Sequence, residues 1–172
     1  MKNQAKCEQG FSLLELIIVV MLIGLISGIA LPSLLSRWDD ERLNAASKIS
    51  VAWLDDLRRK AIQHSTVCRA TWDDMETKLR GQCDNNPSSI MVLNLKSEIN
   101  NSEKLRLSPE PDSPTTWIFT PRGTSTTSGQ VKFSVLGDPH DQGRCLRLSA
   151  PLGLIRAARQ TPTGECDFTT NF

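Results

Sequence analysis

The chain has 172 residues, of which 39% are hydrophobic, and its 20 basic and 19 acidic side chains leave a formal net charge of +1. This length suffices for one membrane segment and one soluble head, but not for two heads. The near-neutral charge excludes a protein that binds nucleic acid through its overall field, so any basic site has to be local.

The first predicted element is a long apolar helix near the amino terminus. From Leu13 to Leu31 every residue except Glu15 is apolar or small, which approaches the roughly 20 residues that a helix needs to cross a bilayer. The run is longer than the apolar part of a secretory signal peptide. Two lysines precede it and few basic residues follow it closely, which places the amino terminus in the cytoplasm. The sequence therefore predicts a single-pass membrane helix over residues 11–35.

Glu15 is the one charged side chain within this apolar run. A carboxylate is costly in a membrane helix, so its presence indicates a function. No Lys, Arg or His lies between Gly10 and Ser36, so the segment itself offers no cationic partner. A cut between Gly10 and Phe11 would allow the new α-amino group of one copy to pair with Glu15 of another. The residues alone leave a second interpretation equally open, in which Glu15 is protonated or reaches the nearby interface.

The order of residues in this segment is a further signal: a short basic leader, GFSLLE at residues 10–15, and an apolar run followed by Pro32. This order resembles the amino terminus of type IV prepilins and type II secretion pseudopilins. The resemblance implies that a prepilin peptidase removes the leader, residues 1–10, by cutting between Gly10 and Phe11, and that it methylates the amino group of Phe11. It also implies that Glu15 guides the stacking of subunits into a filament whose helical core includes Pro32.

The same resemblance implies a location and a set of partners. The precursor is expected in the inner membrane with its amino terminus in the cytoplasm, and the head in the periplasm or on the cell surface within a filament. The expected partners are other pilin or pseudopilin subunits, the prepilin peptidase and the inner-membrane assembly platform. Tip-most pseudopilins of the K type usually lack the glutamate, so Glu15 indicates a subunit that stacks beneath or within a tip complex.

Residues 36–64 are predicted to continue the helix into the head, beyond a kink or local loosening at Pro32. We interpret Trp53 as a core residue. The acidic run Asp39, Asp40 and Glu41 is interpreted as a solvated face. Apolar side chains recur at spacings of three and four, which is typical of an amphipathic helix that packs on a sheet; they are Ala46, Ile49, Trp53, Leu57 and Ala61.

Residues 65–172 are predicted to form a β-rich head. The expected fold class is therefore α+β, with a long amino-terminal helix packed on an antiparallel sheet. Residues 96–115 hold three prolines among polar side chains, which predicts a surface loop. Short runs of strand-like composition are separated by turn residues; they are residues 66–72, 90–95, 116–120, 130–136, 144–149 and 153–158.

Within the head, the sequence FTPRG at residues 119–123 precedes the last three predicted strands. This order resembles the GspH/FimT family of minor pseudopilins and minor pilins, which often carry a Phe-x-Pro-x-Gly turn between two such strands. The matching positions are Phe119, Pro121 and Gly123. Proline fixes φ and glycine permits a positive φ, so both suit a tight turn.

Five cysteines occur, and Cys7 lies in the leader that processing would remove. An even number in an exported head indicates disulfides, for which three connectivities are possible. Proximity along the chain favours Cys68 with Cys83 and Cys145 with Cys166. A structural zinc site is the alternative, but the short C-x-x-C spacing of such sites does not occur.

Motifs that carry chemistry are few. The chain has two histidines, no glycine-rich phosphate loop and no G-x-S-x-G, so we predict that it is not an enzyme and uses no cofactor. The segment GDPHDQG at residues 137–143 contains Asp138, His140 and Asp141. Gly, Asp and Pro in succession are typical of a hairpin turn, so no metal site is predicted there.

A local excess of positive charge lies near the carboxy terminus, because no acidic residue occurs between positions 144 and 160. Some FimT-like minor pilins of natural competence systems bind DNA through basic residues in this region, which makes DNA uptake the alternative function. Strand alternation nevertheless places the members of each pair of neighbouring arginines on opposite faces. The main prediction is therefore a structural subunit in or near the tip or priming complex of a type II secretion pseudopilus or type IV pilus. The candidate DNA contacts are Arg144, Arg147, Arg156 and Arg159.

Overall fold

The computed structural model describes residues 12–99, 103–137, 143–161 and 163–169, without the side chains of residues 29–36. Within these ranges a long helix, α1, is followed by nine strands and one short helix, α2. The chain divides into two compact units, Met1–Trp38 and Asp39–Phe172. We refer to the second unit as the head.

Helix α1 runs from Leu13 to Gln63 and is unbroken at the position of Pro32. Its described apolar side chains in the first unit are exposed all round. In the head, by contrast, the apolar stripe predicted from the sequence is confirmed, because Ala46, Leu57 and Ala61 are fully buried and Ile49 and Trp53 pack against the core. A spacing of three or four residues places these side chains on one face.

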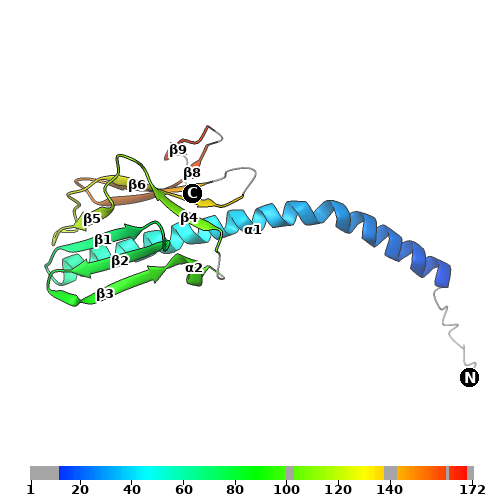
Figure 1. Ribbon diagram of the computed structural model, residues 1–172, viewed down its shortest axis with the longest axis horizontal. Coiled ribbons are helices and arrows are strands. Elements are labelled where there is room, and N and C mark those ends of the chain that lie inside the picture. Colours follow the sequence, from blue (N-terminus) through cyan, green and yellow to red (C-terminus); the bar gives the residue numbers. More distant parts are fainter. Residues whose placement is uncertain (1–11, 100–102, 138–142, 162, 170–172) are drawn as a thin grey trace, which may run out of the picture. The chain divides into compact units, whose positions relative to one another are not determined.

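The head contains two antiparallel sheets rather than one (Figure 1). The first has the strand order β3-β2-β1-β5 and the second the order β4-β6-β7-β8-β9. The strands of the first sheet are β1 (Cys68–Asp73), β2 (Lys78–Cys83), β3 (Asn86–Asn94) and β5 (Thr116–Phe119). Those of the second are β4 (Leu105–Pro109), β6 (Gly129–Val135), β7 (Arg144–Ser149), β8 (Leu154–Gln160) and β9 (Cys166–Asp167).

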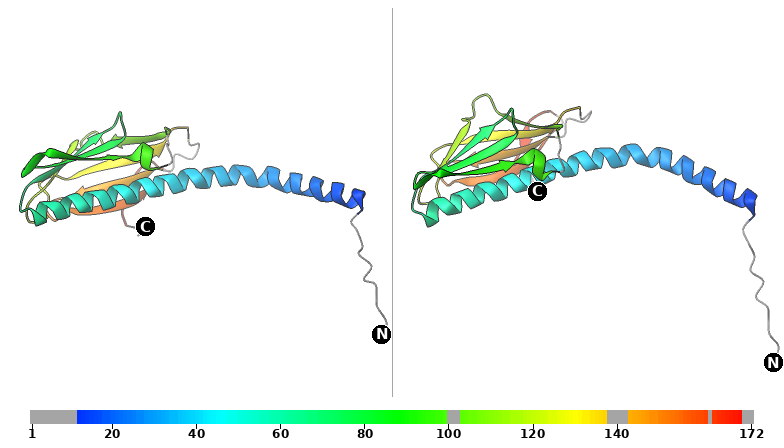
Figure 2. Two further views of the ribbon diagram at one scale, coloured as in Figure 1. Left: turned by 90° about the horizontal axis from the view of Figure 1, so that it is seen from below. Right: turned by 60° about the horizontal axis from the view of Figure 1, so that its bottom comes forward.

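The core of the head lies where both sheets meet the second part of α1, which Figure 2 shows lying along them. The ring of Trp72 stands edge-on to that of Trp117, with 4.8 Å between the centroids, and to that of Phe133, with 6.5 Å. Trp72 and Trp117 belong to the first sheet and Phe133 to the second, so these aromatic contacts join the two layers. Leu54 and Leu57 complete the core from the helix.

Each of the strands predicted from the sequence overlaps a strand of the structure, but residues 96–115 are not simply a loop. They include part of α2 (Leu95–Glu98) and the whole of β4. Leu105 and Leu107 of β4 are buried and alternate with more exposed neighbours, as in a strand with one face on a core. Strand β2 also went unpredicted, since it has no β-branched or aromatic residue and is fixed by pairing with β1 and β3.

Candidate functional site

The candidate assembly segment is residues 13–28 of α1. The exposed fractions of its large apolar side chains range from 48% at Val19 to 78% at Leu13. A helix that is apolar on every side is ordinarily buried, either in a membrane or among other protein chains. The segment therefore has a surface that water does not solvate well and that calls for an external partner.

Glu15 lies in the first turn of this helix and is exposed. A carboxylate near a helix amino terminus interacts favourably with the helix dipole. Among the described residues Glu15 takes part in no ion pair. The proposed cleavage residues, Gly10 and Phe11, lie outside the described residues, as does the side chain of Pro32. No helix within the described ranges is both long enough and apolar enough to span a membrane.

Arg144 joins β7 to the first turns of α1 that belong to the head. Its side chain is almost wholly buried and forms an ion pair with Asp40. Its Nε donates a hydrogen bond to Oδ1 of Asn44 at 2.8 Å, and its Nη1 donates to the carbonyl oxygen of Gly143 at 3.2 Å. A buried guanidinium needs such acceptors because its desolvation is otherwise uncompensated. Arg144 therefore connects β7 to α1 inside the head, and its buried side chain is not accessible to DNA.

The pairing of Arg144 corrects the interpretation of the acidic run at the start of the head helix. Asp40 does not merely form a solvated face, since it accepts the charge of a buried arginine. Asp39 pairs with Arg42 one turn further along the same helix, at 2.9 Å. Asp40 and Asn44 are four residues apart, so both reach the same strand.

The remaining candidate arginines lie in the β7–β8 hairpin. The prediction that Arg144 and Arg147 lie on opposite faces is confirmed, because Arg144 is buried and Arg147 is exposed. The register pairs Arg147 with Arg156 on one face and Arg144 with Arg159 on the other. Arg147 donates hydrogen bonds to Oε1 of Gln130 at 3.0 and 2.8 Å, and its guanidinium carbon lies 4.0 Å from the centroid of the Phe168 ring. The four arginines thus form two separate pairs and no common stripe.

The turn at residues 119–123 rests against the last turns of α1. Gly123 has a φ of 74°, and its N–H donates to the carbonyl oxygen of Thr120 at 2.9 Å. Its own carbonyl oxygen accepts a hydrogen bond of 2.6 Å from Nε of Arg58. A Cβ atom added at Gly123 would lie 2.7 Å from Cδ1 of Ile62. Glycine is required here both by the backbone angle and by this close approach.

The structure pairs Cys68 with Cys83 and Cys145 with Cys166, the same two pairings that chain proximity favoured. The first disulfide joins register partners on β1 and β2, and the second joins β7 to β9. In the part of the chain that the structure describes, no cluster of His, Cys, Asp and Glu could hold a metal ion. The segment at residues 138–142, with its two aspartates and one histidine, lies outside that part.

Comparisons with known proteins gave one match for the amino-terminal segment and one for the fold. Residues 5–31 match the family described as the prokaryotic N-terminal methylation motif. The fold is similar to the crystal structure of the type IV minor pilin FimU of Pseudomonas aeruginosa, with a TM-score of 0.54 and 14% sequence identity over 75% of this chain and 95% of that chain. The chain therefore combines a prokaryotic N-terminal methylation motif with a fold similar to that of a minor pilin. No curated protein sequence matches it.

Two features of this pilin-like head had no detectable signal in the sequence. Arg144 and Asp40 are separated by 104 positions, and neither lies in a motif that would pair them. The cavity between α1 and β8 arises from the packing of a helix against a strand more than 90 positions away. The turn glycine, Gly123, was by contrast identified from the sequence, because Phe-x-Pro-x-Gly is a local pattern.

Proposed function

We propose that the chain is a minor subunit that assembles through its amino-terminal helix into a type II secretion pseudopilus or a type IV pilus, in or near the tip or priming complex. In this proposal the precursor is anchored in the inner membrane with its amino terminus in the cytoplasm. The prepilin peptidase cuts between Gly10 and Phe11 and methylates Phe11. Glu15 then guides the subunit into the filament, and the head contacts neighbouring subunits.

The observation that carries this proposal is the exposed apolar surface of residues 13–26 with Glu15 as its one charge. Such a surface suits lipid before assembly and the helices of other subunits afterwards. A carboxylate buried in such a helix bundle needs a cation, and a neighbour's new α-amino group is one. The methylation motif at residues 5–31 and the minor-pilin fold support the same conclusion.

Processing is tested by the intact mass of the full chain extracted from its native membrane. We expect loss of residues 1–10, the mass of one added methyl group, and a gain of four hydrogens on reduction, two for each disulfide. An uncleaved chain would overturn the proposal, because the free amino group of Phe11 would not exist.

Assembly is tested by Glu15→Ala, with Ser12→Ala as the control at an exposed position just before the helix. Glu15→Ala should be processed normally and yet be depleted from sheared filaments, because the residue acts after cleavage. Ser12→Ala should be incorporated like the unaltered chain. Equal incorporation of the two variants would remove Glu15 from the mechanism.

The arrangement of the arginines does not favour DNA capture as a second function. Arg144 is buried in an ion pair, and Arg147 is held by Gln130. Phosphate binding requires several cations that neutralise one backbone together. An electrophoretic mobility series with the full chain should therefore show no salt-sensitive retardation that depends on Arg147 or Arg156.

A further inference from the structure

Among the described residues, no strand pairs with one edge of β8 along most of its length. On one side it pairs with β7 from Leu154 to Arg159, but on the other side it pairs with β9 at Arg159 and Gln160 alone. Within the described ranges no other strand adjoins it. A strand edge of this kind has unpaired N–H and C=O groups and accepts a further strand readily.

The register shows which peptide groups face that edge. The N–H of Gln160 donates to the carbonyl oxygen of Gly143, on the β7 side, at 3.0 Å. Because hydrogen bonding alternates along an antiparallel strand, the even-numbered residues of β8 bond to β7 and the odd-numbered ones face away. The peptide groups of Ile155 and Ala157 therefore face the open edge.

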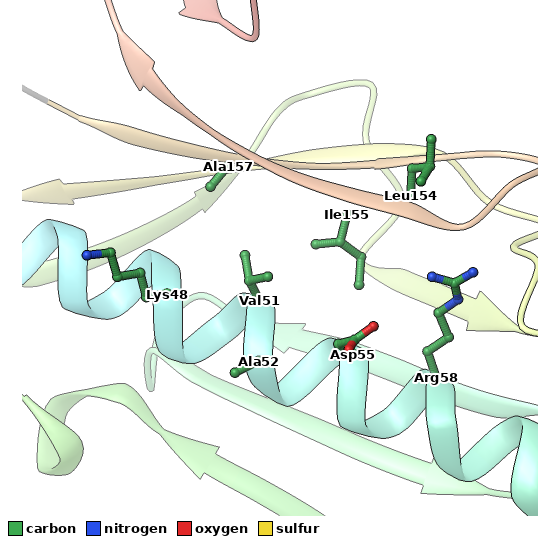
Figure 3. A pocket seen from close by; sticks show the side chains of 8 residues that line it. All are labelled: Lys48, Val51, Ala52, Asp55, Arg58, Leu154, Ile155 and Ala157. Atoms are coloured by element: carbon green, nitrogen blue, oxygen red, sulfur yellow. The ribbon is translucent and has the colours of Figure 1, made fainter. Parts of the chain in front are cut away.

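A cavity of about 410 Å³ lies beside this edge, between β8 and α1 (Figure 3). Ile155 points from the strand toward the helix, and Val51 points from the helix toward the strand. Ala157 lines the cavity further along β8. The open edge thus supplies backbone hydrogen-bonding groups, and the cavity supplies an apolar recess for side chains that point the same way as Ile155 and Ala157.

The charges around the edge include two cations, Lys48 and Arg156. Arg58 donates to the carbonyl oxygen of Gly123, and Asp55 pairs with Arg59 at 2.9 Å. Lys48, which lines the cavity, and Arg156, on the outer face of β8, are exposed. Among the described residues neither of these two cations forms an ion pair.

A second copy of the same edge would be a poor partner. Two β8 strands that paired antiparallel through Ile155 and Ala157 would place Arg156 directly opposite the same residue of the other copy. Like charges directly opposite each other on neighbouring strands are destabilising, whereas an acidic residue in that position is stabilising. The edge therefore favours a foreign strand over a symmetric dimer.

We propose that this edge binds an extended segment of another protein, added as a strand antiparallel to β8 and in line with β9. The segment has an acidic residue opposite Arg156 and apolar residues opposite Ile155 and Ala157. The main chain supplies the affinity and the alternating side chains supply the specificity, as in other cases of strand addition. This site goes beyond the proposed function and does not depend on it.

The first experiment uses the full chain in detergent micelles and a fluorescein-labelled peptide, Thr-Val-Glu-Val-Thr, with binding followed by fluorescence anisotropy. We expect saturable binding. Replacing the peptide glutamate by lysine should weaken binding, by up to about fivefold. Arg156→Glu should reverse this preference. Arg122→Glu, at an exposed arginine in the turn at residues 119–123, should leave it unchanged. Absence of saturable binding, or equal binding of both peptides, would overturn the proposal.

The second experiment tests the backbone pairing with the protein unaltered. A methyl group on the amide nitrogen of either peptide valine removes a donor that faces β8 and should abolish binding. The same group on the amide of the peptide glutamate faces away and should be tolerated. Equal binding of all three peptides would show occupation of the apolar cavity without strand addition and would overturn the proposal.

A protein variant completes the test. Ala157→Pro removes a donor from the open edge and leaves the bonds of β8 to β7 in place, which is where proline is tolerated in a sheet. It should abolish peptide binding and preserve the tryptophan fluorescence of the folded head. Self-association of the unaltered chain that disappears in this variant would show that a second copy occupies the edge, against the proposal.

Discussion

The two parts of helix α1 use their apolar residues in different ways. In residues 13–28 apolar side chains surround the helix, and the described ones are exposed. In residues 39–63 they form one stripe that is buried against the two sheets, while charged side chains occupy the rest of the surface. The second part therefore finds its partner within its own chain, and the first part requires one from outside.

Under the proposed function, this difference separates stability from assembly along one continuous helix. Substitutions in the second part should act on the unfolding of the head, and those in the first part on what the chain associates with. The two effects are measurable independently, because the tryptophans of the core, Trp72 and Trp117, lie in the head and report its unfolding.

The strongest test of this separation compares one leucine from each part. Leu57→Ala removes a fully buried side chain and should lower the free energy of unfolding by about 2–5 kcal/mol. Leu22→Ala alters an exposed position and should change it by no more than about 0.5 kcal/mol. Urea unfolding of the full chain in micelles, followed by tryptophan fluorescence, measures both. Similar losses would mean that the first part also stabilises the head.

A smaller effect is expected where the head helix begins. Asp40→Ala leaves the buried guanidinium of Arg144 without its carboxylate and should lower the free energy of unfolding by about 2 kcal/mol, less than for a fully buried pair because Asp40 is partly exposed. Asp39→Ala breaks a pair whose arginine, Arg42, is 37% exposed and therefore stays hydrated when the aspartate is removed, so this variant should cost no more than about 0.5 kcal/mol. Adding Arg144→Met to Asp40→Ala should recover part of the loss. Equal losses of stability in the two alanine variants would show that the ion pair of Arg144 with Asp40 does not stabilise the head.

The smallest predicted effect concerns the turn against the end of the helix. Gly123 and Gly137 both have positive φ angles, of 74° and 83°. Alanine strains the backbone at either position, but only at Gly123 does it also meet Ile62. Gly123→Ala should therefore be less stable than Gly137→Ala by about 1 kcal/mol. Adding Ile62→Val should reduce this difference in stability, as measured by thermal unfolding. Equal stability of the two glycine variants would show that the turn does not pack on the helix.

Local patterns in the sequence were sufficient for the helix and for most strands. The buried stripe from Ala46 to Ala61 follows from spacing alone, and β6 and β7 follow from alternating apolar residues. Strand β4 was missed because two alternating leucines were outweighed by nearby prolines, and burial against β6 decides its conformation. Strand β2, with charged and small residues, is a strand because β1 and β3 lie on either side.

The candidate sites divide in the same way. The motif around Glu15 is one continuous stretch of sequence, and so is the turn at Gly123. Both were therefore identified from the sequence. The faces of Arg144 and Arg147 also followed from alternation within one strand. The pairing of Arg147 with Arg156 depends on the register between two strands, and that of Arg144 with Asp40 on the docking of a helix. Each of these contacts depends on how two separate segments pack, so a pattern within one segment does not predict it.

The disulfides have a mechanical consequence. Each one joins strands of the same sheet, Cys68 with Cys83 in the first and Cys145 with Cys166 in the second, and neither includes α1. Besides its chain connection to β1, the helix is therefore held against the sheets by non-covalent contacts, and a tension applied from its amino-terminal end reaches the ion pair of Asp40 with Arg144 before the leucines further along. Under load the helix would separate from the sheets, starting at its amino-terminal end. The sheets, each cross-linked by a disulfide, would stay folded, so the helix would pack against them again when the load is removed.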